Sequence, residues 1–431
     1  MTWDRFRSVL PATARVNGRG RLEIGGRDCR ELVEDFGSPL FVMDETEALD
    51  RLQAYTRAFG EGCVHYAAKA FLTAPFASLV ASAGAGMDCA SGGELYTALA
   101  GGFPAGRIVL HGNNKSEDEL RQGVDSGVGT VVADSVDDIV RLSRIAGDSP
   151  VKVLIRVTPG IEAHTHEYLQ TGVEDTKFGI PVGEAALEAA RLAAGSPGVE
   201  LRGIHCHIGS QILTLEPFAE TAAIMMRCLA RCREETSLDL PDLNIGGGLG
   251  IAYEPGEKPP AVEELARVIV DRVTQECGAL GAAVPRVLVE PGRSIVGPAM
   301  VTLYTAGVVK DLPGIRRYLS VDGGMSDNIR PMLYQAAYTF LSADRPDAPH
   351  DTGYAVAGKL CESGDLLTRS AVLPEVRDGE LLAVAATGAY GYSMASNYNR
   401  LPRPAVVGVR DGKVRTMARR ETYEDLVRLE L

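Results

Sequence analysis

The segment HYAAKAF, residues 65–71, places Lys69 between a β-compatible run and a helical pattern. Residues 63–66 favour a strand, and residues 71–79 favour a helix. A lysine at this junction lies where a strand ends, and in an α/β barrel that face collects the ligand-contacting residues. Lysine also forms Schiff bases with carbonyl cofactors. The segment therefore predicts a barrel with Lys69 at its mouth, and a solvated surface lysine is the alternative that other motifs must exclude.

Strand-like and helical runs alternate between residues 38 and 300. The strand-like runs are Leu40–Met43, Val64–Ala67, Met87–Ala90, Ile108–Leu110, Thr130–Ala133, Lys152–Val157, Gly203–His207, Leu243–Ile245 and Val287–Val289. Helical stretches rich in Ala, Leu, Glu and Arg lie between them, at 91–101, 116–127, 135–146, 183–194, 215–235 and 261–280. This alternation predicts a parallel sheet covered by helices. Eight or nine strands favour a (β/α)8 TIM barrel over residues 38–300, closing near Glu290.

The two ends of the chain have a different pattern. Residues 1–37 and 301–431 are rich in Val, Thr, Tyr and turn residues, with short β-compatible runs such as 300–309 and 381–385. We expect one antiparallel β domain, a sandwich or barrel, built from both ends and interrupted by the TIM barrel.

Composition limits the classes of function. Of 431 residues, 45% are hydrophobic and 23% are charged, which is typical of a soluble globular protein. The net charge of −13 and the absence of a basic block argue against a nucleic-acid surface. No apolar run is long enough for a transmembrane helix, and the N-terminus lacks the apolar core of a signal peptide, so we expect a cytoplasmic protein without a membrane partner. The eight cysteines have no metal-ligand spacing, which predicts no metal site and mostly buried free thiols.

Two motifs follow predicted strands near the end of the barrel. In NIGGGLG (244–250), Gly246, Gly247 and Gly248 allow backbone N–H groups to approach a phosphate closely, although a tight turn explains them equally well. In EPGRS (290–294), Glu290 is placed to pair with a cationic ring nitrogen, and Arg293 suits a phosphate or carboxylate. A surface ion pair is the alternative for Glu290 and Arg293.

Two further motifs end earlier strands. His205 and His207 in HCHIGSQ (205–211) project from the same strand face, and two interpretations compete: a paired-histidine metal site and an imidazole stacked on a flat cofactor. Only His350 follows them, which disfavours the metal site, so we expect His207 to contact a cofactor and His205 to be a satisfied core histidine. In GMDCASGGEL (86–95), Asp88 lies at a strand exit and Ser91 is a predicted helix N-cap.

The C-terminal region carries CESGD (361–365) and GAYGYSMASNYN (388–399). Cys361 beside Glu362 combines a transferable proton with a negative charge, whereas inert packing is the alternative for any single cysteine. In IRPMLY (329–334), Arg330 and Tyr334 are four residues apart and share one face if the segment is helical. A guanidinium and a phenol suit a carboxylate, and Glu362 suits an ammonium.

Together these motifs resemble the fold-type III pyridoxal-phosphate decarboxylases, the group that also contains alanine racemase-like and ornithine decarboxylase-like proteins. HYAAKAF, HIGSQI, IGGGLG, EPGRS, DGGM (322–325), CESGD and GAYG…SNYN occur in the family's order and approximate spacing, over residues 11–408. The segment 160–180 is similar to the family as well. Within the family, the chain most resembles the branch that decarboxylates diaminopimelate.

The resemblance implies a homodimer with active sites shared between subunits and pyridoxal 5'-phosphate as the cofactor. Lys69 would hold the cofactor through a Schiff base, His207 would stack on its ring, and Glu290 would bind the ring nitrogen. The residues implied around the cofactor's ring and phosphate are Asp88, His207, Ser210, Gly246, Gly247, Gly248, Glu290, Arg293 and Tyr390. Cys361 and Glu362 would enter from the other subunit.

The implied reaction is decarboxylation of meso-2,6-diaminopimelate to L-lysine and carbon dioxide, a step of lysine biosynthesis, with Cys361 as the proton donor. The implied substrate-binding residues are Arg293, Arg330, Tyr334, Glu362 and Tyr390. Three alternatives stay open: a sister decarboxylase acting on ornithine, lysine, carboxynorspermidine or a carrier-tethered amino acid; an amino-acid racemase; and a non-catalytic regulatory homologue.

Overall fold

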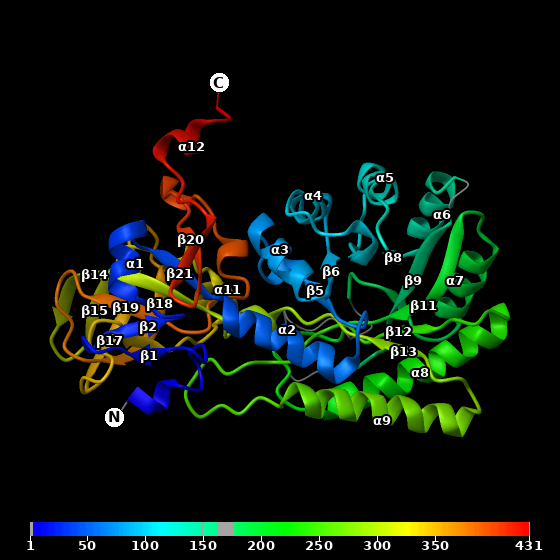
Figure 1. Ribbon diagram of the computed structural model, residues 1–431, viewed down its shortest axis with the longest axis horizontal. Helices are drawn as coiled ribbons and strands as arrows, with labels where there is room; N and C mark the ends of the chain where they lie inside the picture. The colour runs from blue at the N-terminus through cyan, green and yellow to red at the C-terminus, as the bar shows by residue number, and fades with distance from the viewer. Residues whose placement is uncertain (1–2, 148–149, 162–175, 431) are drawn as a thin grey trace. The chain divides into compact units, whose positions relative to one another are not determined.

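The computed structural model describes residues 3–147, 150–161 and 176–430 (Figure 1). The chain forms two compact units. Unit 1 comprises Met1–Arg51, Ile251–Lys258 and Arg293–Leu431, and unit 2 comprises Leu52–Gly250 and Pro259–Gly292. Most of the family-like segment 160–180 lies outside the described residues.

Unit 2 is built on a ring of parallel strands whose order in space follows the chain. The described strands of the ring are β5 (His65–Ala67), β6 (Gly86–Cys89), β7 (Ile108–Leu110), β8 (Thr130–Ala133), β9 (Val151–Thr158), β11 (Val199–His205), β12 (Asp242–Asn244) and β13 (Arg286–Leu288). A short strand, β10 (Ile180–Pro181), pairs with β9. Val64 forms a parallel bridge to Val289, and the His65 N–H donates to the Val289 carbonyl at 2.9 Å. This bridge joins the last strand to the first, which confirms the predicted TIM barrel.

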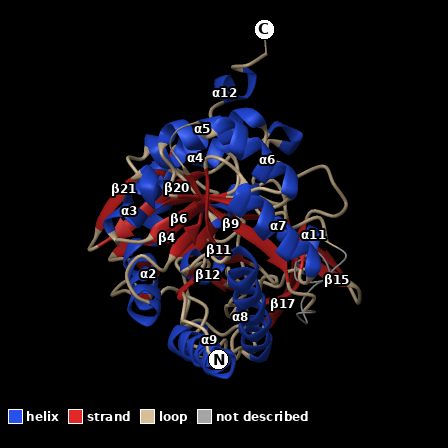
Figure 2. Cartoon of the chain, turned by 90° about the vertical axis from the view of Figure 1, so that its right-hand side faces the viewer, coloured by secondary structure: helices blue, strands red, loops and turns tan. Residues whose placement is uncertain are grey.

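Helices connect successive strands and lie outside them (Figure 2). They are α3 (Ala74–Ser82), α4 (Gly92–Ala100), α5 (Glu117–Ser126), α6 (Val136–Ile145), α7 (Glu184–Gly195), α8 (Glu216–Thr236) and α9 (Val262–Leu280), with 3-10 turns η2 (Ala68–Ala70) and η3 (Ala105–Arg107). Serine hydroxyls start three of these helices: Ser91, Ser116 and Ser135 each accept a hydrogen bond from the backbone N–H three residues later. The predicted N-cap at Ser91 is thus confirmed.

An apolar layer fills part of the barrel interior. Its buried members lie on or next to several strands of the ring, and Phe59 packs against them. They are Cys63, Val109, Val132, Leu154 and Leu288. The inward-facing residues of neighbouring strands meet here, as expected when a ring of eight strands closes on itself.

Unit 1 is built on a mixed sheet. Its path runs β18 (Leu366–Leu373), β17 (Thr352–Ala357), β15 (Arg316–Val321), β14 (Met300–Leu312), β4 (Leu40–Asp44), β20 (Ala405–Arg410) and β21 (Lys413–Ala418), and β19 (Leu381–Val384) joins β14 to β16 (Phe340–Ser342). Most pairs are antiparallel, but β15–β17 and β4–β20 are parallel, so the sheet is not wholly antiparallel as expected.

Shorter elements complete unit 1. They are η1 (Trp3–Phe6), the sheet β1 (Arg15–Val16), β2 (Leu22–Ile24) and β3 (Arg27–Asp28), α1 (Cys29–Phe36), α10 (Arg293–Val296), α11 (Arg330–Tyr334), η5 (Tyr392–Met394), η6 (Tyr398–Arg400) and α12 (Tyr423–Val427). Helix α2 (Glu45–Phe59) contains the junction between the units, which falls after Arg51.

The strand at Leu40–Met43 corrects one expectation. The sequence grouped this run with the strands of the barrel, but β4 pairs with β14 and β20 in unit 1. All five residues of β4 are buried. Such a run is apolar wherever it is buried, so its composition does not reveal which sheet it joins.

The cysteines and the helices agree with two further expectations. Cys361 is exposed and the other seven cysteines are buried free thiols. Within the described part of the chain, no helix combines the length and apolarity needed to cross a membrane.

Candidate active site

The predicted site residues are divided between the two units. In unit 2 they are Lys69, Asp88, His207, Ser210, Gly246, Gly247, Gly248 and Glu290, and in unit 1 they are Arg293, Arg330, Tyr334, Cys361, Glu362 and Tyr390. Those of unit 2 lie at or just after the carboxyl ends of strands: Lys69 is in η2 after β5, and Glu290 follows β13. Ring closure therefore brings the unit 2 residues to one end of the barrel.

Glu290 lies at the centre of a hydrogen-bonded cluster. Its Oε1 accepts from His111 Nε2 at 2.9 Å and from Asn244 Nδ2 at 2.7 Å, and its Oε2 accepts from His205 Nε2 at 3.0 Å. The carboxylate is buried, with 6% of the residue exposed. Since a carboxylate has about four lone-pair sites, these three donors leave about one for a further N–H.

The charge of this cluster is set by competing effects. Burial by itself raises the pKa of Glu290, but the charges and hydrogen bonds of His111 and His205 outweigh burial and hold that pKa well below its usual range. Burial lowers the pKa of His205 to about 4, so its ring is neutral at pH 7. Burial also opposes charge on His111, yet Asp88 and Glu290 raise its pKa. The cluster thus presents an ionised carboxylate, the form that binds a protonated ring nitrogen.

The glycine turn after β12 packs too closely for side chains. A Cβ on Gly247 would lie 2.2 Å from the Glu290 carbonyl oxygen, and one on Gly246 would lie 2.4 Å from the Cys206 carbonyl oxygen. Gly246 and Gly248 also have positive φ angles of 73° and 126°. Glycine is therefore required here both by conformation and by close approach.

His207 is bound to this turn through one ring nitrogen. The Gly247 N–H donates to His207 Nδ1 at 3.3 Å, so Nδ1 is the acceptor and a neutral ring carries its proton on Nε2. Burial and the charges of Lys69 and Arg156 hold the pKa of His207 well below its usual value. The ring is therefore neutral, which suits a side chain that stacks on a planar group.

Lys69 and Asp88 lie at the same end of the barrel as the Glu290 cluster. Lys69 is exposed, and its charge influences the pKa values of Asp88, Glu94 and His207, which places it near all three. Burial raises the pKa of Asp88, opposed by the charges of His111 and Lys69. Asp88 Oδ1 is 3.7 Å from His111 Nε2 and accepts no hydrogen bond from a described residue. An exposed lysine, an ionised carboxylate and a glycine turn suit the carbonyl, the ring nitrogen and the phosphate of pyridoxal phosphate, so these residues fit that cofactor.

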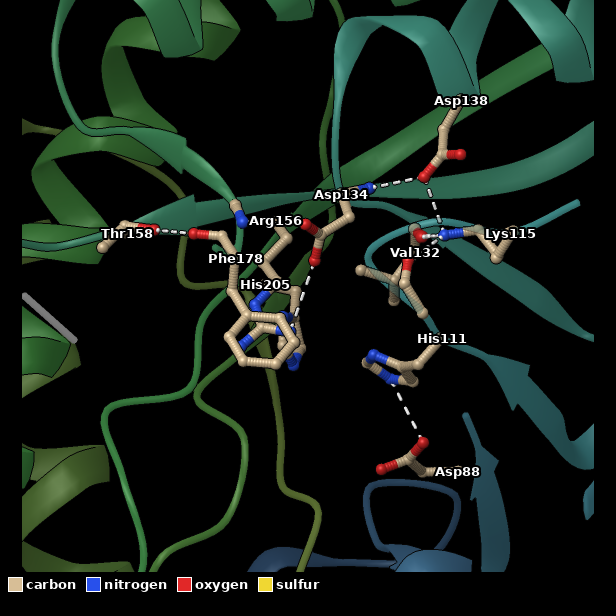
Figure 3. Close-up of polar contacts among 12 residues, drawn as sticks. Asp88, His111, Lys115, Val132, Asp134, Asp138, Arg156, Thr158, Phe178 and His205 are labelled. Atoms are coloured by element: carbon tan, nitrogen blue, oxygen red, sulfur yellow. Dashed lines mark hydrogen bonds and ion pairs between the residues drawn. The ribbon is translucent and has the colours of Figure 1, made fainter. Parts of the chain in front are cut away.

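A buried ion network supports the strands that carry these residues (Figure 3). Arg156 on β9 lies 3.3 Å from Asp134 Oδ1, and the other oxygen of Asp134 accepts from the Gly179 N–H at 2.9 Å. Asp138 Oδ2 accepts from Lys115 Nζ at 2.7 Å and from the Asp134 N–H at 3.0 Å. Since Lys115 and Asp138 are each only 2% exposed, their charges compensate each other inside the protein.

In unit 1, two buried arginines share one tyrosine. Arg293 and Arg330, 4% and 3% exposed, both donate to the Tyr253 hydroxyl, Arg330 at 3.0 Å. Arg330 also donates to the Tyr338 hydroxyl. Burial favours the neutral phenol of Tyr253, but the two guanidinium charges lower its pKa. No described carboxylate forms an ion pair with Arg330.

The predicted geometry of IRPMLY is confirmed. Arg330–Tyr334 is helix α11, and the Arg330 guanidinium lies 5.9 Å from the centre of the Tyr334 ring. Both side chains therefore face the same way, together with Tyr253 and Tyr338 at 5.3 and 5.7 Å.

The two C-terminal motifs lie side by side. The Cys361 N–H donates to Asn399 Oδ1 at 2.6 Å, and the Tyr398 hydroxyl lies 3.3 Å from Glu362 Oε2. Asp365 holds the turn by accepting from the backbone N–H of Leu360 and of Met325 at 2.9 and 2.7 Å. This turn leaves Cys361 exposed.

Tyr390 occupies an uncommon backbone conformation. Its φ angle is 61°, in the left-handed region that non-glycine residues rarely adopt. The Arg293 guanidinium lies 5.0 Å from the centre of its ring. Strain of this kind persists where the surroundings over-determine a side-chain position, which agrees with a binding role for Tyr390.

Several residues of the site were not anticipated. Four of them lie outside the candidate residues predicted from the sequence: His111, Asn244, Arg156 and Tyr253. His111 nevertheless follows the apolar strand IVL, and Asn244 ends another strand. His205, expected to be a satisfied core histidine, is buried, but its Nδ1 has no hydrogen-bond partner among the described residues. The residues that could form a metal site differ from the expected pair of His205 and His207. The potential ligand atoms of His111, His205 and Glu290 lie within 4.8 Å of one another, whereas His207 faces the glycine turn. Mutual hydrogen bonds already occupy those atoms.

A barrel with a lysine, a carboxylate and a glycine turn at its carboxyl end defines a class of cofactor-dependent enzymes. Residues 46–297 match the family described as pyridoxal-dependent decarboxylase, pyridoxal binding domain. The chain belongs to this family of pyridoxal-dependent decarboxylases.

Full-length relatives give a narrower assignment. The chain is 46% identical to the diaminopimelate decarboxylase of Bacillus subtilis over 98% of both chains, and 43% identical to that of Mycobacterium tuberculosis over 98% of both. Among solved structures, it is similar to diaminopimelate decarboxylase from M. jannaschii, with a TM-score of 0.91, 32% identity and 98% of both chains covered. The Helicobacter pylori enzyme complexed with L-lysine gives a TM-score of 0.86 at 32% identity, with 93% of this chain and 98% of that chain covered. These relatives place the chain in the diaminopimelate decarboxylase branch of the family.

Proposed function

We propose that this protein decarboxylates meso-2,6-diaminopimelate to L-lysine and carbon dioxide, with pyridoxal phosphate bound to Lys69. The observation that carries the proposal is the ionised Glu290 carboxylate at the carboxyl end of the barrel, held by His111, His205 and Asn244. The substrate follows from the full-length relatives that carry this name. The mostly buried thiols agree with a reducing, cytoplasmic setting.

Pyridoxal phosphate, when bound, supplies a carbonyl that condenses with amines and a ring that accepts the electrons released when the carboxylate leaves. Glu290 keeps the ring nitrogen protonated through its remaining lone pair. The neutral His207 ring would stack on the cofactor, and Gly246, Gly247, Gly248, Ser210 and Arg293 would hold its phosphate. Asp88 orients the Lys69 amine by charge.

The substrate's distal end distinguishes it from simpler amino acids. Arg330 and Tyr334 would bind the distal carboxylate, and Glu362 of the partner subunit would bind the distal ammonium. Arg293 and Tyr390 would contact both cofactor and substrate. Burial of Arg330 among tyrosine rings, without a described carboxylate partner, supports this role because an added carboxylate would complete its pairing.

The remaining step is protonation of the substrate carbon after the carboxylate has left. We propose that Cys361 of the partner subunit gives this proton, because its thiol is exposed on a turn fixed by Asp365 and Asn399. The site is then complete only in a homodimer.

The test combines labelling with a substrate panel. Borohydride reduction of the holoenzyme followed by peptide mapping is expected to place a pyridoxyl group on Lys69, and Lys69→Ala should abolish the label. Lys152→Ala is the matched control, because this exposed lysine is the second residue of β9 and lies at the other end of the barrel. Carbon dioxide release should be at least about a hundredfold faster, by kcat/KM, from meso-diaminopimelate than from L-lysine or L-ornithine.

Other results would support the alternatives. Preference for ornithine, lysine or a carrier-tethered substrate would indicate a sister decarboxylase, and racemisation without carbon dioxide release would indicate a racemase. A pyridoxyl label on another lysine would contradict the assignment of Lys69. No label and no turnover would indicate a regulatory homologue.

A further inference from the structure

A second cavity lies at the amino-terminal end of the barrel. It encloses about 260 Å3 and is lined by residues from all of the barrel strands described above, including His65 of β5, Thr130 of β8, Lys152 of β9, Arg202 of β11 and Asp242 of β12. A single water needs only about 10–15 Å3 by the same measure, so there is room for a small solute.

This cavity is distinct from the candidate active site. None of the predicted cofactor residues lines it. Val109, Leu154 and Leu288 belong both to its lining and to the apolar layer of the barrel interior, so that layer forms one wall. The active-site residues lie at or after the opposite, carboxyl ends of the strands.

The charged lining is mainly cationic. Arg107, Lys152, Arg202 and Arg286 line the cavity, and Asp242 is the one carboxylate among the lining residues. Asp242 pairs with Arg286 at 2.9 Å and lies 3.7 Å from Arg202. This excess of positive charge occurs in a chain whose net charge is −13, so it is a local feature rather than the general character of the surface.

Several donors in the cavity have unused capacity. Lys152 forms no ion pair or hydrogen bond to a described side chain, and Arg107 donates to the Ala81 carbonyl rather than to a carboxylate. Arg202 Nη1 donates to Glu200 Oε1 at 3.0 Å, whereas Arg202 Nε and His65 Nδ1 are buried atoms without a hydrogen-bond partner in the described chain. Such atoms are costly unless a ligand or water satisfies them.

Five of the lining residues are glycines: Gly62, Gly84, Gly86, Gly106 and Gly129. Two of them are closely packed: a Cβ on Gly86 would lie 2.3 Å from His65 Cδ2, and one on Gly129 would lie 2.2 Å from the Gly106 carbonyl oxygen. A Cβ added to Gly62, Gly84 or Gly106 would meet no atom within 4 Å, so open space lies before these positions. The cationic side chains therefore surround space that an anion can enter.

We propose that this cavity is a second ligand site, which binds a small anion with at least two negative charges, of the phosphate or polycarboxylate class. Lys152 and Arg202 supply the charged hydrogen bonds, and Arg107 and Arg286 add to the positive potential. The proposal stands independently of the reaction at the other end of the barrel.

Calorimetric titration of the holoenzyme at pH 7.5 tests the site, with inorganic phosphate or citrate as the probe and sodium chloride holding ionic strength constant. One saturable site per chain is expected for at least one probe, and the probe that binds tells phosphate from polycarboxylate recognition. Lys152→Gln and Arg202→Gln should each raise the Kd about tenfold, as loss of a charged hydrogen bond implies. Arg267→Gln on the exposed face of α9 is the control and should leave the Kd unchanged.

Three results would overturn the proposal. One is no saturable heat from either probe above the chloride background. Another is the same Kd in Lys152→Gln as in Arg267→Gln, which would exclude the cavity even if Arg202→Gln failed to fold. The third is loss of the bound cofactor's absorbance during titration, which would show that the anion enters the cofactor's phosphate site.

Discussion

At the scale of single residues, the state of each titratable group follows from its immediate neighbours. Glu290 is ionised because two imidazoles and an amide donate to it, while His205 is neutral because burial outweighs that same carboxylate. One of the two groups is charged and the other is neutral, so their roles differ. The Glu290 carboxylate carries the negative charge, and the His205 ring holds that carboxylate in position.

His65 allows a test of such burial in the stability of the fold. Burial lowers its pKa to about 4, against the ordinary 6.5. Between these values the unfolded state binds one more proton, so the contribution of His65 to stability is fully present above pH 6.5 and is lost as the pH falls towards 4. We expect His65→Gln to lose less stability than the wild type over this window, by up to about 1.4 kcal/mol per pH unit. Thermal unfolding midpoints from pH 7.5 to 4.5 measure this, and parallel curves would contradict it.

Arg330 provides the test of substrate recognition. Arg330→Met keeps an unbranched apolar stem but removes the charged guanidinium. We expect kcat/KM for meso-diaminopimelate to fall by a factor that corresponds to about 1.5–3 kcal/mol of lost transition-state stabilisation. The loss with a weakly accepted monocarboxylate such as L-lysine should be much smaller, because that substrate lacks the distal carboxylate. Unchanged cofactor absorbance and unfolding midpoint provide the folding control. Equal losses on both substrates would remove the distal-carboxylate role.

At the scale of elements, the turn after β12 determines how closely neighbouring strand ends approach. Its glycines lie against backbone oxygens that follow β11 and β13, and the Asn244 side chain bonds both the Gly246 N–H and Glu290. One short turn therefore connects the expected phosphate-binding backbone to the ring-nitrogen carboxylate.

We predict that Gly247→Ala disrupts both functions of this turn. The added Cβ, 2.2 Å from the Glu290 carbonyl oxygen, must displace backbone, which costs about 1–3 kcal/mol of stability. Cofactor affinity should fall about tenfold or more as Glu290 moves. Gly278→Ala is the matched control, since its Cβ meets nothing within 4 Å on helix α9 and should stabilise by about 0.5–1 kcal/mol. Cofactor titration and thermal unfolding measure both variants, and similar values for the two would contradict the packing argument.

At the scale of the whole molecule, the proposed site needs two chains. Lys69 belongs to unit 2 and Cys361 to unit 1, and the proposal draws them from different subunits. Mixing inactive Lys69→Ala with inactive Cys361→Ala should therefore restore part of the activity, up to about a quarter if subunits exchange at random. Lys69→Ala mixed with Lys69→Ala,Cys361→Ala is the control and should stay inactive. No recovery after exchange is verified with labelled subunits would contradict a shared site.

The barrel could be predicted from the sequence alone. Alternating strand-like and helical runs predicted the parallel ring, because strands and helices each produce a characteristic period of apolar residues in the local sequence. Ser91 as a cap, the helix at Arg330–Tyr334 and the mostly buried thiols also followed from local rules. Lys69 and Glu290 could be selected as candidates because their residue types are chemically distinctive at the ends of strands, and their roles stay predictions.

Contacts between residues that are far apart in the sequence become visible only in the tertiary structure. Leu40–Met43 reads as a barrel strand but pairs in unit 1, because an apolar run reports burial and not the identity of its partner. His111 reaches Glu290 across 179 positions, and Tyr253 reaches Arg330 across 77. The four cationic residues that line the cavity at the amino-terminal end of the barrel likewise come from separate elements of the chain. No local pattern encodes such contacts, since they form only when closure of the sheet brings strand ends together.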